Sequence, residues 1–307
     1  MSLQIKVMET FFIIAGCCFL PSCMQQQKDK SCGLTNPFFA MDTATDAKNK
    51  TASQQVQLLK EIGYAGIGYW ERDRQRGISG LSEILEELDK QGLKAYPVYF
   101  GVHLDADREK YSPILPEAIK LLKGRDTAIW LYVSSSTYKV SSPEGDPCAV
   151  EIIREIADMA EQSGVKIALY PHHKSWLERV EDAVRVAKKV DRKNVGVTFN
   201  LCHWLRTDDE ENMRAVLELA MPYLFVVTIN GADSGSSNWN GLIQPLDSGT
   251  FDTYKFLKTL KELGYTGPIG LQGFGVKGDA YQNLKRSMDA WRRLSHRLAQ
   301  ECPEADH

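Results

Sequence analysis

The stretch from Val165 to Leu201 reads VKIALYPHHKSWLERVEDAVRVAKKVDRKNVGVTFNL and contains a strand–helix–strand unit. Its two ends, 166–172 and 195–201, are apolar on nearly every residue, as strands buried on both faces of a parallel sheet are. Its middle, 180–190, carries apolar residues at the spacing of a helix with one buried face. Because parallel strands need such a crossover, this unit predicts an α/β fold with a parallel sheet.

The same alternation extends outward from this unit in both directions. We expect six further strands, at 37–42, 66–70, 94–100, 128–134, 224–230 and 268–274. Helical patterns lie between or after them, at 52–62, 81–93, 116–122, 150–163, 211–219, 254–263 and 281–298. Eight strands, each followed by a helix, predict a single (β/α)8 TIM barrel over residues 35–298. An open doubly wound sheet would need a glycine-rich phosphate turn after the first strand, and Met41-Asp42-Thr43-Ala44 is not one.

The N-terminal residues 1–22 have the pattern of a lipoprotein signal peptide. The apolar run 11–20 is too short to span a membrane, and Leu20-Pro21-Ser22-Cys23 places a cysteine where cleavage would expose it for lipidation. Residues 23–34 are polar and read as a tether, and 299–307 as a tail. We therefore expect a bacterial lipoprotein held to the membrane by a lipid anchor at Cys23 and located outside the cytoplasm, in the periplasm or on the cell surface.

Composition narrows the class of partner. The chain is 43% hydrophobic and 25% charged, and its formal net charge of −3 gives no electrostatic basis for binding nucleic acid. Beyond Cys23, the cysteines are Cys32, Cys148, Cys202 and Cys302, without the spacing of metal ligands. Two alternatives remain for these cysteines, a Cys32–Cys302 disulfide or free thiols. The sequence does not indicate an oligomeric state.

Candidate site residues follow from the barrel, because barrel sites lie at the carboxyl ends of the strands. Polar side chains and histidines gather at these ends, which favours a polar pocket. Aromatic residues near the same ends would suit a small-molecule sugar or sugar derivative. The candidates are Tyr170, His172, His173, Asn200, His203, Thr228, Asn230, Gln272, His103 and Trp70.

Four segments late in the chain resemble the sugar phosphate isomerase/epimerase superfamily, the xylose isomerase-like barrels. They are Leu246-Asp247-Ser248-Gly249-Thr250-Phe251-Asp252, Gly264-Tyr265-Thr266-Gly267-Pro268-Ile269, Asn200-Leu201-Cys202-His203 and Leu169-Tyr170-Pro171-His172. The resemblance covers about residues 35–298. It implies a divalent metal held by a glutamate, an aspartate, a histidine and a glutamate on the fifth to eighth strands.

This chain departs from that ligand set. The corresponding positions hold Tyr170, Asn200, Thr228 and Gln272, which are all neutral. A hard cation needs anionic oxygen ligands, so we expect the family metal to be lost and no cofactor to be bound. The resemblance also implies that His203 contacts substrate hydroxyls, so we still expect a pocket that binds a sugar.

Three functions remain open. The first is a sugar isomerase, epimerase or lyase acting on an unphosphorylated or oxidised sugar, with His172 or His203 as the base and Tyr170 or Asn230 polarising the carbonyl. The second is a non-catalytic sugar-binding lipoprotein. The third is a zinc enzyme that uses His103, His172 and His203 as ligands.

Overall fold

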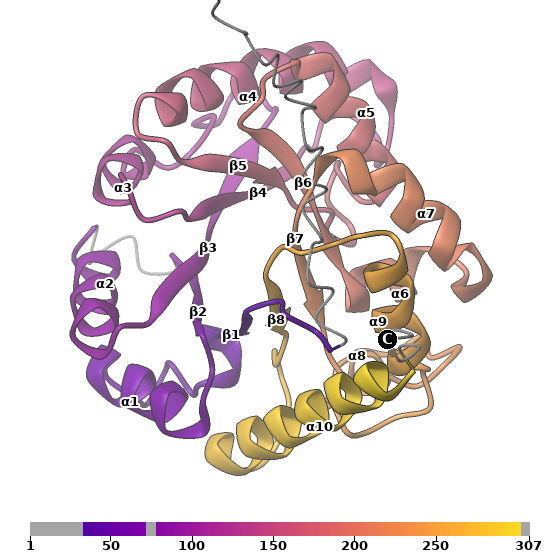
Figure 1. Ribbon diagram of the computed structural model, residues 1–307. Helices are drawn as coiled ribbons and strands as arrows, with labels where there is room; N and C mark the ends of the chain where they lie inside the picture. Colours follow the sequence, from indigo (N-terminus) through magenta and orange to yellow (C-terminus); the bar gives the residue numbers. More distant parts are fainter. Residues whose placement is uncertain (1–32, 72–77, 302–307) are drawn as a thin grey trace, which may run out of the picture. The chain divides into compact units, whose positions relative to one another are not determined.

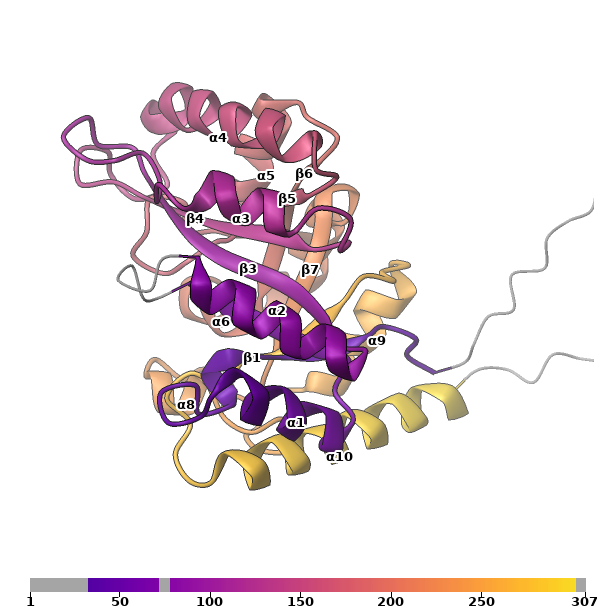
Figure 2. The same cartoon turned by 90° about the vertical axis from the view of Figure 1, so that its left-hand side faces the viewer.

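The computed structural model describes residues 33–71 and 78–301, and these form one closed barrel of eight parallel strands. The strands follow one another around the barrel in chain order, and β1 closes it by pairing with β8. Helices surround the strands (Figure 1), and the view from the side shows them packed along the outside of the barrel (Figure 2). The predicted (β/α)8 TIM barrel is confirmed.

The strands have the following bounds: β1 Phe38–Met41, β2 Gly66–Trp70, β3 Lys94–His103, β4 Ala128–Ser134, β5 Lys166–Leu169, β6 Val195–Asn200, β7 Leu224–Ile229 and β8 Ile269–Leu271. Strand β3 is longer than expected because its last residues continue to pair with β4, up to the His103–Ser134 pair. Strands β5 and β8 are shorter than expected. The chain keeps one more backbone bond after each of them, from Tyr170 to the Leu131 carbonyl and from Gln272 to the Ile229 carbonyl.

The helices are α1 Ala52–Ile62, α2 Ser79–Gln91, α3 Leu115–Leu121, α4 Asp146–Glu161, α5 Val180–Val190, α6 Leu201–Thr207, α7 Met213–Ala220, α8 Trp239–Leu242, α9 Thr253–Glu262 and α10 Ala280–Gln300. The expected helices 52–62 and 180–190 have the observed bounds. Two short helices, α6 and α8, were not expected. They lie directly after β6 and in the loop after β7, so both stand at the carboxyl ends of the strands.

Large aromatic side chains fill the inside of the barrel. Phe39 stacks on Tyr96 with ring centroids 4.9 Å apart, and Trp130 stacks on Tyr170 at 4.6 Å. Glycines make room for them: a Cβ at Gly270 would come within 2.3 Å of the Phe39 ring. This packed layer is the floor on which the pocket at the carboxyl end rests.

Gly249 is required by the backbone of segment 246–252, one of the segments that carry the resemblance. Its φ is +88°, and a Cβ there would lie 2.0 Å from the Ala232 carbonyl oxygen, which is fixed by a bond from the Phe251 amide. We expect Gly249→Ala to lower the free energy of unfolding by more than about 2 kcal/mol, measured by urea denaturation. Gly164→Ala is the control, because φ is +67° there with no atom within 4 Å, and it should cost about 1 kcal/mol. Equal losses in the two variants would contradict the steric argument.

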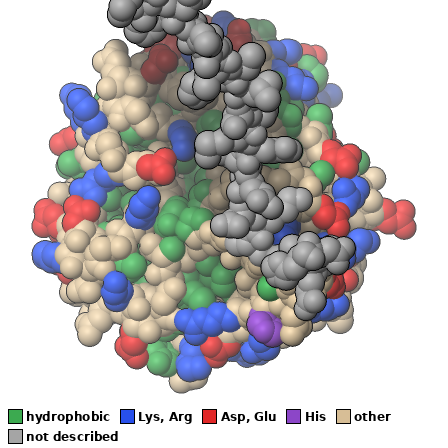
Figure 3. Space-filling model, viewed as in Figure 1, with side chains coloured by type: hydrophobic (Ala, Val, Ile, Leu, Met, Phe, Trp, Pro, Cys, Tyr) green, Lys and Arg blue, Asp and Glu red, His purple; other side chains and the backbone are tan. Residues whose placement is uncertain are grey.

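The signal peptide, the tether up to Cys32 and the C-terminal Cys302 lie outside the described residues, so the anchor and the Cys32–Cys302 pair remain predictions. Cys148 and Cys202 are free thiols. Within residues 33–71 and 78–301, no helix is both long and apolar enough to cross a membrane. On the face shown in Figure 3, basic and acidic side chains alternate around the edge, in keeping with the small net charge.

Candidate active site

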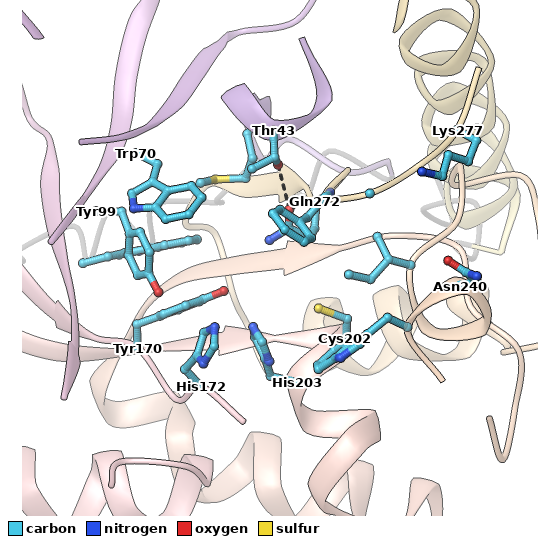
Figure 4. Close-up of a pocket in the computed structure, with 16 residues that line it drawn as sticks. Thr43, Trp70, Tyr99, Tyr170, His172, Cys202, His203, Asn240, Gln272 and Lys277 are labelled. Carbon is cyan, nitrogen blue, oxygen red and sulfur yellow. Dashed lines mark hydrogen bonds between the residues drawn. The ribbon is translucent and has the colours of Figure 1, made fainter. Parts of the chain in front are cut away.

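A cavity of about 480 Å³ opens at the carboxyl ends of the strands. This volume is within the range of small-molecule sites. Five of the predicted residues line it: Trp70, Tyr170, His172, His203 and Gln272. Figure 4 shows the rings of His172 and His203 next to each other, across the cavity from Thr43 and Gln272. The remaining lining residues are Met41, Thr43, Tyr99, Trp130, Cys202, Trp239, Asn240, Ile243, Phe274, Gly275 and Lys277.

Asn200 directs its amide nitrogen toward the barrel centre. Its Oδ1 accepts hydrogen bonds from the Cys202 thiol at 2.9 Å and from the His203 backbone amide at 3.4 Å, which caps α6. A backbone amide can only donate, so the side-chain oxygen must face the helix and the nitrogen must face away from it. That nitrogen donates to the Tyr170 hydroxyl at 2.8 Å.

The side-chain amide of Gln272 has the same orientation, with its oxygen bound by the protein and its nitrogen facing inward. Its Oε1 accepts from the Thr43 hydroxyl at 2.8 Å and from the backbone amides of Gly273 and Phe274 at 3.0 and 3.2 Å. The oxygen is therefore fully used by three donors, and the side-chain nitrogen is left for the barrel centre. Burial raises the pKa of the Tyr170 phenol, and Gln272 acts to lower it.

These orientations do not fit the divalent metal that the fold family implies. At the inherited positions, both amide oxygens are engaged by donors on the protein, and the amide hydrogens point inward, where they would repel a cation. The fourth position, Thr228, is fully buried, and its hydroxyl has no hydrogen-bond partner among the described residues. None of the described residues that line the cavity carries a carboxylate, which hard ions need.

The backbone of His173 holds both neighbouring imidazoles. Its carbonyl lies 3.0 Å from Nδ1 of His172, and its amide donates to Nδ1 of His203 at 3.4 Å. A carbonyl only accepts and an amide only donates, so His172 carries its proton on Nδ1 and the neutral His203 carries its proton on Nε2. The two rings, with centroids 4.2 Å apart, thus present opposite groups: a free Nε2 lone pair on His172 and an Nε2–H on His203.

Glu178 anchors the turn that makes this arrangement possible. Its carboxylate accepts from the Lys174 amide at 2.8 Å and lies 2.8 Å from Nδ1 of His173. Lys174 has a positive φ of 67°, which a side chain adopts only when its surroundings hold it. The carboxylate therefore fixes the backbone that orients the two imidazoles.

Burial keeps these groups neutral. Desolvation lowers the pKa of His203 well below its usual range, and His172 and His173 act in the same direction. Desolvation also lowers the pKa of His172, although the bond to the His173 carbonyl opposes it. Burial raises the pKa of the Tyr170 phenol well above its usual range, with Tyr99 and Cys202 adding to the effect and Gln272 opposing it. At neutral pH the site therefore holds two neutral imidazoles and a protonated phenol.

Five predicted residues do not line the cavity: Asn200, Thr228 and His173, described above, and Asn230 and His103. The amide nitrogen of Asn230 donates to the carbonyls of Gly231 and Leu242, so it holds the loop after β7. The ring of His103 lies 2.8 Å from the Ser134 hydroxyl and outside the cavity lining. No group of three metal-binding side chains occurs within the described residues, so the structure does not bring His103 together with His172 and His203 as the zinc interpretation requires.

Other lining residues were not among the candidates. Trp239 and Asn240 come from α8, and Phe274 and Lys277 come from the loop after β8. These positions lie beyond the strand ends on which the sequence analysis relied. Their common signal is that each sits in a loop after a strand, where barrel sites are built.

Residues 56–294 match the family of xylose isomerase-like TIM barrels. The chain belongs to this family. The match begins within α1 and ends within α10, so it includes every residue that lines the cavity except Met41 and Thr43. Among curated proteins, an inosose isomerase of Bacillus velezensis is 24% identical over 253 residues, covering 75% of this chain and 86% of that protein.

Solved structures of the same fold extend the comparison. The IOLI protein with a bound zinc atom superposes with a TM-score of 0.67 at 17% identity, over 86% of this chain and 98% of that one. The 3-keto-D-glucoside 4-epimerase YcjR of E. coli gives 0.66 at 16% identity, over 84% and 99%. At these identities the likeness to the solved structures shows the shared fold alone.

Proposed function

We propose that this protein is a sugar isomerase or epimerase that moves a proton next to the carbonyl of an unphosphorylated or oxidised sugar without the family metal. The observation that carries the proposal is the pair of imidazoles with opposite tautomers in one cavity. A neutral imidazole with a free Nε2 lone pair is a base suited to neutral pH, and a second with Nε2–H is a hydrogen-bond donor. The 3-keto-D-glucoside named for one structural relative supports a keto sugar as the class to test first.

Each group has a role in that reaction. The Nε2 atom of His172 accepts the proton from the carbon beside the carbonyl, and the electron pair of the broken C–H bond moves toward the carbonyl oxygen. The Tyr170 hydroxyl accepts a bond from Asn200, so its own proton is available to the developing oxyanion. His203 donates to a neighbouring hydroxyl. Return of the proton from His172 to the former carbonyl carbon, while the hydroxyl on the deprotonated carbon gives its proton to the oxyanion, gives the isomer. Because His172 lies on one face only, the epimer requires the enediolate to turn over in the cavity before the proton returns.

Solvent exchange tests this function before the natural substrate is known. Purified protein would be incubated in D2O with 3-ketoglucose, methyl 3-keto-glucoside and related keto sugars, and the hydrogens beside the carbonyl would be followed by NMR. We expect enzyme-dependent replacement of one hydrogen by deuterium. Measurable binding of these sugars without any exchange would instead support the non-catalytic sugar-binding interpretation.

Metal independence is a separate prediction. After prolonged dialysis against EDTA, the exchange rate should be unchanged, because the amide oxygens of Asn200 and Gln272 are already occupied by donors from the protein. Metal analysis of the purified protein should find substoichiometric zinc, manganese and magnesium. Loss of activity on chelation with recovery on adding one of these ions would contradict the argument from the four neutral positions.

We also propose that the barrel is carried outside the cytoplasm on a lipid anchor at Cys23. The support is the short apolar run and the Leu20-Pro21-Ser22-Cys23 sequence. Mass spectrometry of membrane-extracted protein should find an acylated Cys23 as the first residue. An unprocessed Met1 on protein recovered from the cytosol would refute this location.

A further inference from the structure

Two exposed aromatic side chains stand at the mouth of the cavity. Within residues 33–71 and 78–301, four large hydrophobic side chains are exposed: Val140, Leu219, Trp239 and Phe274. Trp239 is 41% exposed and Phe274 is 58% exposed, and both line the cavity, whereas Val140 and Leu219 do not. Exposed apolar surface beside a concave site indicates a contact with something that enters the site.

Trp239 is held in place before any ligand arrives. The guanidinium of Arg206 lies over its ring at 6.0 Å and donates to the Ser237 carbonyl, in the loop that leads to α8. The ring also meets His203 edge-on, with centroids 5.4 Å apart, and so lies directly beside the imidazole pair. Such fixing lowers the conformational entropy that binding would otherwise cost.

We propose that Trp239 and Phe274 form a platform for a second ring of the substrate, so that the natural substrate is a glycoside or disaccharide with its keto-sugar ring in the cavity. Indole and phenyl faces stack on the apolar C–H faces of sugar rings, and the contact removes exposed aromatic surface from water. The two side chains come from different parts of the chain, α8 and the loop after β8, and both line the cavity. This proposal depends on the proposed function only in taking the ring inside the cavity to be a keto sugar.

The alternative occupant is a second copy of this chain, since exposed aromatic residues also form protein interfaces. The position of both residues in the lining of a concave cavity favours a small ligand, because a flat protein surface would not reach the same walls. The two occupants predict different measurements: a change of affinity for a disaccharide, or a change of molecular mass in solution.

Calorimetry with two neutral ligands tests the proposal: methyl 3-keto-glucoside, and a disaccharide whose non-reducing ring is 3-keto-glucose. The wild-type protein should bind the disaccharide about tenfold more tightly or better, because the second ring adds two stacking contacts. Trp239→Ala and Phe274→Ala should each reduce this ratio by about threefold to tenfold. Val140→Ala and Leu219→Ala are matched controls and should leave the ratio unchanged. Thermal melts show whether each variant folds. If Trp239→Ala does not fold, Phe274→Ala still tests the proposal.

A wild-type ratio near one, or a ratio that neither aromatic variant lowers, would overturn the platform. A smaller sedimentation mass in these variants with an unchanged ratio would overturn it in favour of a dimer surface. Deuterium exchange with methyl 3-keto-glucoside is scored separately. Exchange without a disaccharide preference leaves the proposed function standing and removes the platform. A disaccharide preference without exchange leaves a sugar-binding platform and removes the catalytic proposal.

Discussion

His172→Asn should lower kcat for proton exchange by about 10²–10⁴-fold, the usual contribution of a general base. Asparagine can place an N–H where Nδ1 of the imidazole stands, so the bond to the His173 carbonyl at 3.0 Å can be kept. It has no equivalent of the free Nε2 lone pair, so the base is removed with little disturbance of the turn. The measurement is deuterium exchange at saturating keto sugar, together with the affinity from calorimetry.

The matched control is His296→Asn, the same substitution at an exposed position of α10, which should exchange at the wild-type rate. If the chain only binds sugar, His172→Asn should weaken affinity by about 1–3 kcal/mol and there is no exchange to lose. Wild-type exchange in the His172→Asn variant would show that another group is the base.

The same assignment has a pH consequence. Desolvation lowers the pKa of His172 below the ordinary imidazole value of about 6.5. A base is active only when unprotonated, so a lowered pKa extends its active range toward acid. The acid limb of kcat/KM should therefore lie below pH 6.5, and activity should remain level from there to neutrality. An acid limb above pH 6.5 would contradict burial as the dominant influence on this imidazole.

The sequence predicted the parts of the site that depend on strand order. Tyr170, His172 and Gln272 were found because alternation within a buried strand, together with the barrel geometry, places strand ends at one mouth. The neutral residues at the four ligand positions could also be read directly. The orientation of these side chains could not be read from the sequence. The direction of the Asn200 and Gln272 amides is set by backbone donors at the start of α6 and after β8.

The remaining parts depend on loop conformation, which has no periodic signal. The tautomers follow from the amide and carbonyl of His173, and no side-chain pattern encodes them. Trp239 lies in a loop of about twenty residues after β7, a length at which sequence alone does not indicate where a side chain returns to the site. Asn230 was predicted at the site because it follows a strand. The loop after β7 folds back, however, and the Asn230 amide nitrogen donates to the Leu242 carbonyl within it.

Tyr170→Phe should lower kcat by about 10²–10³-fold, as the loss of one preorganised donor to a developing oxyanion does. Phenylalanine keeps the ring that stacks on Trp130 at 4.6 Å, so the barrel packing is preserved. The change removes the hydroxyl and leaves the Asn200 amide nitrogen without the acceptor it has at 2.8 Å, which should cost about 1–3 kcal/mol of stability. Activity and the free energy of unfolding are therefore measured on the same preparation.

Tyr64→Phe separates these two effects. Tyr64 is also buried, and its hydroxyl donates to the Leu284 carbonyl at 2.9 Å on the outer side of the barrel, away from the cavity. Its loss should destabilise the fold by a similar amount and leave kcat at the wild-type value. If the two variants lose equal stability and only Tyr170→Phe loses turnover, the phenol acts on the substrate. If both keep wild-type turnover, the Tyr170 hydroxyl serves only as the acceptor of the Asn200 amide, and the oxyanion must be stabilised by His203 alone.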